Sequence, residues 1–239
     1  LGIGLRLLNA AARITVQRKL LGMVLKTLFD QTSLWLIGLL TLIMLAVAGY
    51  EVMARQQRLF SGGWGYGLGA MSMFLSSFTI TLLALFTVVK VDPWYQPQYL
   101  IPLLGMLMGN TMSGIAIALD NLTRTTWEQR NLIEARLIMG HDWHRAIASI
   151  RRDALRSGLI PIINAMTTAG IVSLPGMMTG QILAGSPPLE AAKYQLMILF
   201  LIAAGSGIGS VSAIWAGSKR LFDERQRLRL DRLAKISRD

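Results

Sequence analysis

The sequence of 239 residues has no cysteine and little charge. The lack of cysteine excludes disulfides and thiolate metal sites. Charged residues make up 15% of the chain, whereas a soluble domain carries about 25%. The shortage is localised, because the charged residues leave five uncharged stretches: 31–50, 59–89, 93–119, 157–189 and 194–218. This distribution excludes a soluble globular fold and a disordered chain.

The uncharged stretches set the fold class. A helix needs about 20 apolar residues to cross a bilayer, and every stretch reaches that length in a chain that is 53% hydrophobic. An outer-membrane barrel would instead show alternating segments of about 10 residues. The sequence therefore predicts an all-α, polytopic helical membrane protein with a single transmembrane domain over residues 1–239.

Four membrane spans follow directly from the apolar runs. They cover about Ser33–Tyr50, Gly67–Val89, Leu100–Leu119 and Tyr194–Gly217. The stretch 157–189 is longer than one crossing needs, and its four prolines disfavour one straight helix. We therefore expect a span over Leu159–Leu174 and then an irregular piece over Pro175–Pro188, because a broken or re-entrant helix is tolerated where protein or a cavity buries it.

The N-terminal segment Ala10–Phe29 is apolar enough to span the bilayer in part. Its adjacent Arg18 and Lys19 are costly at mid-depth against lipid, so the helix either lies at the interface or turns this pair toward protein or water. We favour a tilted spanning helix, which gives about six spans in all. The chain begins with Leu1, and we expect an N-terminal piece to be missing.

The basic residues predict the orientation. The 24 Lys and Arg residues against 13 Asp and Glu give a net charge of +11. Such an excess suggests nucleic acid in a soluble protein, but here it flanks apolar segments, so we expect no nucleic-acid partner. It concentrates in 51–58, 120–156 and the basic tail 219–239. Because cytosolic loops carry the excess of Lys and Arg, we expect a multi-pass protein of the cell's inner (plasma) membrane with these three regions, including the C-terminus, in the cytosol.

Tryptophan supports the same map. The amphipathic indole ring favours the membrane boundary. Five of the six tryptophans lie within a turn or two of a predicted boundary, namely Trp35, Trp64, Trp94, Trp127 and Trp215. Trp143 is the exception, because it lies inside the predicted cytosolic segment.

Small residues recur at the spacing of four that lets helices approach closely. They form the pairs Gly105/Gly109 and Gly176/Gly180 and the ladder Gly205, Gly209, Ala213 and Gly217. We interpret them as packing seams within the bundle of one chain, and a seam between two copies is the alternative.

No motif for catalysis or nucleotide binding is found. There is no Gly-Lys pair and hence no Walker A motif, so the chain cannot bind ATP through a P-loop. The glycines between 62 and 69 lack the preceding strand of a nucleotide fingerprint, and we interpret them as a flexible loop leading into the membrane. With only Asp142 beside them, His141 and His144 do not complete a metal set, so we expect them to face solvent or a partner. We expect no enzymatic activity.

The segment 123–157 is the predicted cytosolic coupling segment. Within it, Leu132–Met139 is expected to form a short helix that Gly140 breaks. Asp142 is a plausible N-cap, and Trp143–Arg156 is expected to resume as a helix that leads back into the membrane. A rigid protrusion of this kind suits docking into a groove on a partner.

Two resemblances rest on these residues. The order Glu134-Ala135-x-x-x-x-Gly140 resembles the EAA loop by which ABC importer permeases engage their ATPase, although only Ile160-Pro161 echoes the Ile-x-Leu-Pro that should follow. The chain also resembles the FetB family of ABC permeases, which includes bacterial iron-export permeases and plant relatives tied to aluminium tolerance. The stretches that carry this second resemblance are Pro102–Asn110, Gly140–Pro161 and Gly170–Gln195. That family usually has seven spans, of which the first is absent here, and apolar residues at positions 18 and 19.

The FetB resemblance implies a permease subunit of an ATP-driven transporter that exports metal ions such as iron. It implies two copies of the permease, a homodimer, and a FetA-type ATPase that holds ATP and Mg, with no cofactor on this chain. The ATPase-coupling candidates are Glu134, Ala135, Gly140, His141, Asp142, Trp143 and Arg145. The substrate-path candidates are Asn110, Ser173, Pro175, Met177, Met178 and Gln195. The two methionine sulfurs suit copper(I) better than iron, and packing against a moving helix is their alternative role.

Two other functions stay open. A self-contained ion channel or secondary carrier would usually hold Asp, Glu or His within the bilayer, whereas Glu51, Asp120 and Glu190 lie at segment ends. The alternative stays open because Arg18 and Lys19 are ionisable residues inside a predicted span. A scaffold or assembly factor that transports nothing is the third interpretation.

Overall fold

The structure is a computed structural model that describes residues 14–15, 22, 34–90, 92–171 and 174–235. The predicted first helix over Ala10–Phe29, its Arg18–Lys19 pair and the substrate-path candidate Ser173 lie outside the described residues.

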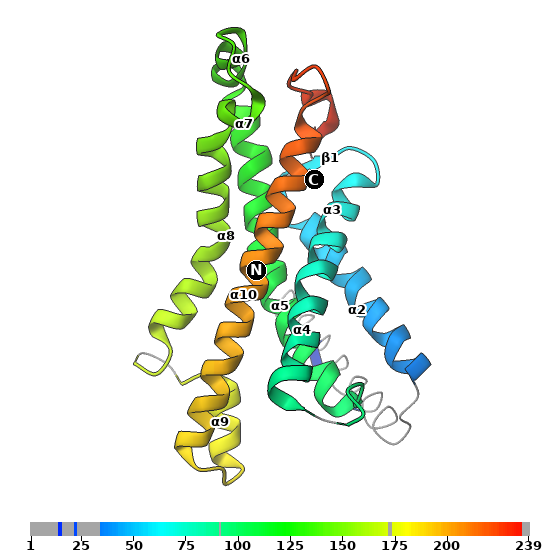
Figure 1. The fold of residues 1–239 in the computed structure, drawn as a ribbon, viewed down its shortest axis with the longest axis vertical. Helices are drawn as coiled ribbons and strands as arrows, with labels where there is room; N and C mark the ends of the chain where they lie inside the picture. Colours follow the sequence, from blue (N-terminus) through cyan, green and yellow to red (C-terminus); the bar gives the residue numbers. More distant parts are fainter. Residues whose placement is uncertain (1–13, 16–21, 23–33, 91, 172–173, 236–239) are drawn as a thin grey trace, which may run out of the picture.

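The described chain is almost entirely helical and forms an elongated bundle (Figure 1). Its first half consists of α2 (Leu34–Ala54), α3 (Trp64–Met73), the π-helical η1 (Phe74–Phe78), α4 (Thr79–Ala84), the π-helical η2 (Leu85–Val89) and α5 (Pro97–Glu128). Its second half consists of α6 (Arg130–Ile138), α7 (Trp143–Ala146), α8 (Ala148–Thr168), α9 (Gly176–Leu183), α10 (Pro188–Leu221) and the 3-10 turn η3 (Leu230–Arg232). Two short antiparallel strands, β1 (Arg58–Phe60) and β2 (Leu233–Lys235), pair Arg58 with Lys235 and Phe60 with Leu233.

The four predicted spans are confirmed. Four helical runs are long and apolar enough to cross a membrane, namely Leu34–Ala54, Trp64–Val88, Pro97–Glu128 and Pro188–Leu221. Each is longer than its predicted span and extends beyond it at one end or both, because helix continues past the membrane boundary wherever no residue breaks it. The helix α5 alone has 32 residues and runs nine positions beyond the predicted end of its span at Leu119.

The region after residue 157 differs in part from the prediction. The span expected over Leu159–Leu174 is met only in part by α8, which begins at Ala148 and ends at Thr168. Among the described helices, α8 is not one of those that are long and apolar enough to cross a membrane. The piece Pro175–Pro188 is not irregular throughout, because it contains the eight-residue helix α9. The prolines flank helices instead of interrupting them, since proline is well tolerated at the first position of a helix. Pro161 does lie inside α8, whose later half leans away from the bundle in Figure 1.

The glycine ladder of α10 packs against α5, which confirms the seam within the bundle. A Cβ at Gly209 would stand 2.7 Å from Cδ1 of Ile115, and one at Gly205 would stand 3.2 Å from Cγ2 of Thr111. Because side chains of α5 fill the space above these glycines, the two helices approach closely. The pair Gly176/Gly180 differs, since a Cβ at either position would meet nothing within 4 Å.

A second close approach joins α5 to α8. A Cβ at Gly158 would stand 2.8 Å from the carbonyl oxygen of Gly114 and 2.8 Å from the Cβ of Ala118. The hydroxyl of Ser210 on α10 lies 3.2 Å from the same point, so three helices meet there. The sequence analysis missed this contact, although Gly114/Ala118 and Ala154/Gly158 have the small-residue spacing of four that would have revealed it.

The glycine run between 62 and 69 is not a loop throughout, so this prediction is wrong in part. Gly62, with φ +70°, lies in the turn after β1, but Gly65, Gly67 and Gly69 belong to α3. A Cβ at Gly69 would stand 3.0 Å from Cγ1 of Val52. At this point the glycine serves the close packing of α3 on α2 rather than flexibility.

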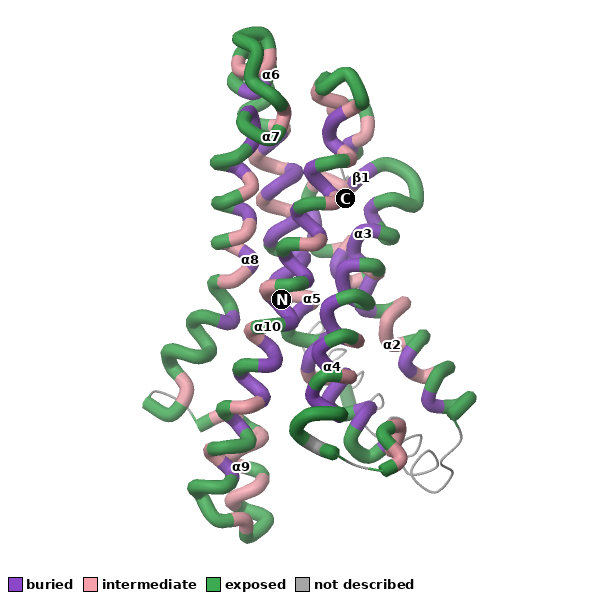
Figure 2. The backbone as a smooth tube through the Cα atoms, in the orientation of Figure 1, coloured by how far each residue is buried: buried purple, intermediate pink, exposed green. Residues whose placement is uncertain are grey.

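Burial divides the bundle along its length. Figure 2 shows buried positions concentrated along α5 and the upper half of α10, whereas α9 and the later half of α8 are mostly exposed or intermediate. The upper core joins Phe60, Leu122, Ile133, Ile150 and Phe222, which come from β1, α5, α6, α8 and the residues after α10. The end of the bundle that carries α6 and α7 therefore has a buried apolar core of its own.

The Gly158 contact predicts a specific loss of stability. Gly158→Leu should lower the free energy of unfolding by about 1–3 kcal/mol or more, the usual cost of overpacking. The reason is that the new leucine side chain would collide with the backbone of α5. The apparent midpoint of thermal unfolding in detergent measures this effect. Gly109→Leu is the matched control, since a Cβ there meets nothing within 4 Å. Equal midpoints for the two variants would contradict the three-helix contact.

Candidate functional site

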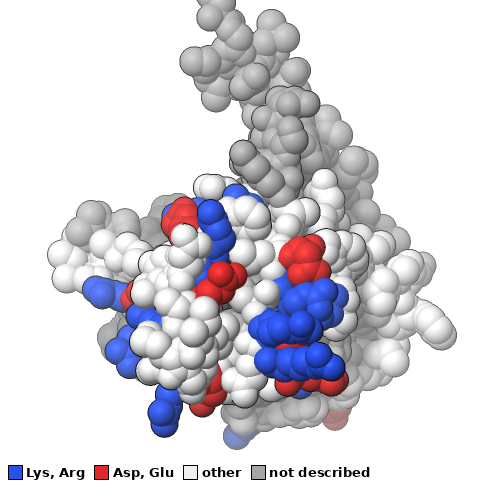
Figure 3. Space-filling model, turned by 90° about the horizontal axis from the view of Figure 1, so that it is seen from above, with Lys and Arg blue, Asp and Glu red and all other residues white. Residues whose placement is uncertain are grey.

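The three basic regions of the sequence lie at one end of the bundle, which we call the basic end. It holds the residues around β1, the helices α6 and α7, and the residues after α10 (Figure 1). Seen from above in Figure 3, this face carries groups of Lys and Arg with Asp and Glu between them. The opposite end carries Lys90 and Lys193, and Lys193 is paired with Glu190 at 2.8 Å. The alternation of charge predicted from the sequence is thus present in the fold.

Tryptophans near the basic end hold cations over their rings. The guanidinium carbon of Arg58 lies 3.9 Å from the ring centroid of Trp127, and that of Arg220 lies 4.5 Å from Trp64. Indole rings favour the membrane boundary, and a cation above the ring adds electrostatic attraction. The boundary between apolar bundle and basic end therefore lies at the level of these pairs.

A protrusion rises from this boundary and consists of α6, the turn at Gly140 and α7. Gly140 has φ +85°, a conformation that favours glycine, so it ends α6 as predicted. The predicted N-cap is also confirmed, because Oδ1 of Asp142 accepts a hydrogen bond from the backbone N–H of Arg145 at 2.7 Å. The helix expected over Trp143–Arg156 is broken once, at Ile147, which separates α7 from α8.

The protrusion is closed by its own contacts. The guanidinium of Arg136 on α6 donates to the carbonyl oxygen of Ala146 at 2.8 Å, which ties α6 to the end of α7. Ile133, Ala146 and Ile147 are completely buried beneath this bond. A buried apolar core and a charge-assisted hydrogen bond thus stabilise the turn between α6 and α7.

The coupling candidates lie together on this protrusion, and most of them are exposed. Glu134, Ala135, Gly140, His141, Asp142 and Arg145 all face solvent, whereas Trp143 is half-buried. The sequence analysis missed two large apolar side chains at the tip, Ile138 and Met139, which are 86% and 68% exposed. The available signal was the apolar pair directly before the helix-breaking glycine.

The residues after α10 fold back against the protrusion. The rings of Phe222 and Trp143 are stacked, with 5.4 Å between their centroids. Oε1 of Gln226 accepts a hydrogen bond from the backbone N–H of Trp143 at 3.2 Å. Arg232 donates to the carbonyl oxygen of Arg220 at 2.8 Å and so caps the end of α10. Within the stretch predicted only as a basic tail, the residues from Phe222 to Arg232 therefore make defined contacts with the protrusion and with the end of α10.

Hydrogen bonds lower the pKa of two aspartates in this stretch, Asp223 and Asp231. The backbone N–H of Arg227 donates to Asp223, which holds the pKa of that carboxyl below its ordinary value. The side chain of Arg229 lowers the pKa of Asp231 to about 2 through its hydrogen bonds. Because this pKa lies below the ordinary value of 3.8, the contribution of Asp231 to stability is complete above pH 3.8 and is lost as the pH falls through about 2.

A groove of about 550 Å³ lies between the protrusion and the turn after Asp223. Its lining includes Glu134, Ile138, His141 and Leu228. His144 is not in this groove; it stacks on Trp143 at 3.6 Å, and its Nδ1 lies 3.3 Å from a guanidinium nitrogen of Arg151. Within the described residues no three His, Cys, Asp or Glu side chains gather closely enough to hold a metal. A mixed apolar and charged groove of this kind can receive a segment of a partner protein.

The substrate-path candidates that the structure describes lie on α5, at α9 and on α10. Pro175 is the N-cap residue of α9, and Met177 and Met178 follow it as half-buried residues of that helix, which packs on α10. Gln195 on α10 is only 8% exposed. Asn110 is separate from them, because it is exposed on α5, where its Nδ2 donates to its own helix at the carbonyl oxygen of Met106.

Among the described residues, three buried amide oxygens lack a hydrogen-bond partner, and two of them belong to α9 and α10 while the third is Oε1 of Gln56. Oε1 of Gln195 and Oε1 of Gln181 on α9 are buried and have no hydrogen-bond partner among the described residues. A buried polar atom without a partner costs free energy, so each oxygen is available to a ligand. The sequence analysis named Gln195 but missed Gln181.

Several known proteins are similar in sequence to this chain. The chain matches the family described as "Uncharacterised protein family (UPF0014)" over residues 1–222. It is 36% identical to UPF0014 membrane protein slr1647 of Synechocystis, covering 93% of this chain and 85% of that protein. It is 31% identical to Protein ALUMINUM SENSITIVE 3 of Arabidopsis thaliana, with coverage of 87% and 74%. It is 28% identical to the probable iron export permease protein FetB of Escherichia coli, with coverage of 96% and 86%. No solved structure matches.

The contact between Trp143 and Phe222 can be tested by proteolysis. Trp143→Ala should free the turn after α10, because stacked aromatic pairs contribute about 0.5–1.5 kcal/mol beyond their buried area. Trypsin should then cut after Arg225 and Arg227 several times faster than in the unmodified protein. Trp143→Phe is the control, since it keeps an aromatic ring in place. Equal cleavage rates in all three proteins would contradict this docking.

Proposed function

We propose that this chain, which belongs to the UPF0014 family, is the membrane-spanning permease subunit of an ATP-driven (ABC) transporter. The chain has no Walker A motif, so a separate ATPase subunit of the FetA type would bind ATP and Mg. The basic end would face the cytosol of the inner membrane, as the Lys and Arg distribution favours. The observation that carries the proposal is the closed protrusion with an exposed apolar tip.

The tip of the protrusion is the part that would dock into the ATPase. Ile138 and Met139 expose large apolar surfaces at the end of α6, and α6 lies at the far tip of the basic end in Figure 1. Exposed apolar side chains of this size usually mark a protein contact. Glu134 and His141 lie beside them in the adjoining groove and would supply polar contacts at its rim.

The protrusion is connected so that its movement would reach the membrane. Only Gln129 separates α6 from α5, and only Ile147 separates α7 from α8. Because α5 and α8 touch at Gly114 and Gly158, they would tilt together when the ATPase pulls or pushes the tip. The half of α8 beyond Pro161, which leans away from the bundle, would sweep the largest distance.

The substrate path would lie between two copies of the permease, at the exposed later half of α8 and at α9. Asn164 is exposed on α8, and a polar side chain at membrane depth is favoured where it faces a cavity instead of lipid. This supports a homodimer in which both copies line the path.

We propose metal ions such as iron as the cargo, moving outward. A relative of this chain is named a probable iron export permease protein, which supports this choice. The free amide oxygens of Gln181 and Gln195 are hard donors suited to hard cations. Met177 and Met178 would then serve mainly as flexible packing between α9 and α10.

Docking through the tip can be tested by a charge at Ile138. Ile138→Asp should weaken the complex with the ATPase by about 2 kcal/mol or more, roughly 30-fold in Kd, as for a buried hot-spot residue. Co-purification of the ATPase from membranes measures this loss. Ile171→Asp is the matched control, because Ile171 is 87% exposed at the opposite end. Unchanged co-purification of the Ile138→Asp protein would reject the docking role.

Coupling can be tested at Gly140. Gly140→Pro should leave the bundle inserted in the membrane but uncouple ATP hydrolysis from transport. Proline cannot adopt φ +85°, and it lacks the N–H that Gly140 donates to the carbonyl oxygen of Leu137. Gly140→Asn is the control, since asparagine tolerates this backbone conformation.

Flux from vesicles holding permease and ATPase, across a panel of metal ions, is the measurement. Normal coupling in the Gly140→Pro protein would contradict the role of the protrusion. Metal flux through this chain alone, without ATPase or nucleotide, would instead favour a channel or carrier.

A further inference from the structure

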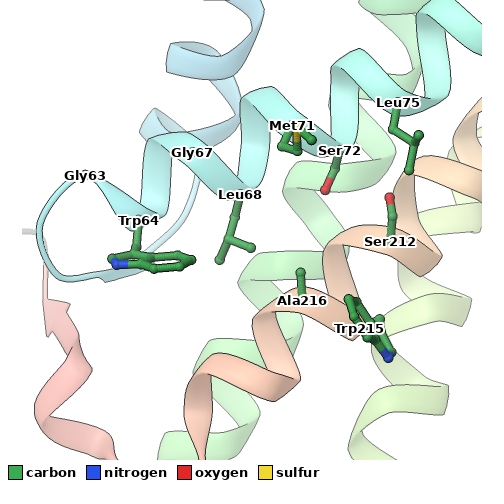
Figure 4. Close-up of a pocket in the computed structure, with 10 residues that line it drawn as sticks. All are labelled: Gly63, Trp64, Gly67, Leu68, Met71, Ser72, Leu75, Ser212, Trp215 and Ala216. Atoms are coloured by element: carbon green, nitrogen blue, oxygen red, sulfur yellow. The ribbon is translucent and has the colours of Figure 1, made fainter.

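An apolar groove lies between α3 and α10 near the basic end (Figure 4). Its volume of about 640 Å³ falls within the range of about 300–1,000 Å³ typical of ligand sites. Leu68 and Ser72 of α3 face Ser212 and Ala216 of α10 across it, as Figure 4 shows. Apart from two serine hydroxyls and the indole N–H groups the lining is apolar, so its occupant has to contribute hydrocarbon.

The groove is open along its length. A Cβ at Gly63 or Gly67 would meet nothing within 4 Å, so the wall formed by α3 faces free space at both positions. Met71, Trp64 and Trp215 on the two walls are 66%, 53% and 54% exposed. Large apolar side chains that remain exposed around a concave surface indicate a site for another molecule.

Two cations stand above the aromatic rings at the basic end of the groove. The guanidinium of Arg220 lies over Trp64 at 4.5 Å, and Nζ of Lys219 lies over the ring of Trp215 at 5.6 Å. In the described part of the chain neither cation has a carboxylate within 4.0 Å, whereas Arg227 and Arg229 have aspartate partners at 2.8 Å. The mouth of the groove therefore holds positive charge that no nearby carboxylate pairs directly.

We propose that this groove binds a phospholipid with an anionic headgroup. Its acyl chain would lie between α3 and α10, and its phosphate would meet Lys219 and Arg220. A hydrocarbon groove that ends at two cations near the membrane boundary matches the two parts of such a lipid, and anionic lipids are attracted to basic residues at this depth.

Other occupants fit the groove less well. A free phosphate ion would leave the apolar lining uncovered. A second copy of this chain, related by a twofold axis along the membrane normal, would bring its own Lys219 and Arg220 next to these two cations. The repulsion between like charges disfavours that arrangement. The proposal is independent of the transport function, because it needs only a chain embedded in a bilayer.

Lipid binding to the full chain in detergent can be measured by native mass spectrometry. The probes are phosphatidylglycerol, phosphatidylcholine with the same acyl chains, and glycerol phosphate as the headgroup alone. We expect phosphatidylglycerol to bind at least about tenfold more tightly than phosphatidylcholine, and glycerol phosphate to compete with neither. Equal affinity for the two lipids, or competition by the headgroup alone, would overturn the proposal.

Two independent variants separate the headgroup from the acyl chain. The double variant Lys219→Gln, Arg220→Gln should reduce the affinity for phosphatidylglycerol to that for phosphatidylcholine, while Arg225→Gln, an exposed charge of the same end, should not. Gly67→Leu should fill the groove and weaken both lipids at least about tenfold, because its side chain enters free space without disturbing the helix. Gly109→Leu is the matched control for that change.

The outcomes decide between occupants. Retention of the preference for phosphatidylglycerol by the double glutamine variant would exclude these cations as the headgroup site. Unchanged lipid binding by Gly67→Leu would exclude the groove. A change in oligomeric state of Gly67→Leu with lipid binding intact would assign the groove to a contact between copies and so overturn the proposal as well.

Discussion

The bundle depends on the close contact of three helices at glycine. Gly114 of α5 and Gly158 of α8 bring their backbones together, and Ser210 of α10 meets both at the same level. Hydrophobic attraction does not pull helices together inside a bilayer, so packing of small residues has to supply the association. This contact fixes the positions of α5, α8 and α10 relative to one another, and it lies between the basic end and the opposite end of the bundle.

The basic end is a second packed unit built on these helices. The protrusion of α6 and α7, the paired strands β1 and β2, and the turn after α10 share one apolar core that includes Ile133, Ile150 and Phe222. Here water surrounds the chain and the hydrophobic effect acts in full. The protrusion is therefore supported from two sides: by the helices it continues, and by the residues after α10 that stack on Trp143.

The opposite end is more exposed along α9 and the later half of α8. Gln181 of α9 and Gln195 of α10 each keep a buried oxygen without a partner among the described residues, as Gln56 does near the basic end. The groove between α3 and α10 is distinct from both, because it faces outward beside the aromatic boundary.

Apolar length and charge placement are properties of the sequence itself. They were enough to predict the all-α membrane fold, the four clear spans and the shared end of the three basic regions. The cap at Asp142 was predicted from a local signal. Local signals also identified Gly140 as a helix break. The irregular piece after Pro175 and the loop of glycines were predicted wrongly in part, because proline and glycine act differently once neighbouring helices supply contacts. Only the tertiary structure decided that Gly158 meets Gly114 and that Phe222 and Gln226 hold Trp143. Those features arise between residues far apart in the chain, and packing in three dimensions, not local composition, determines which of them meet.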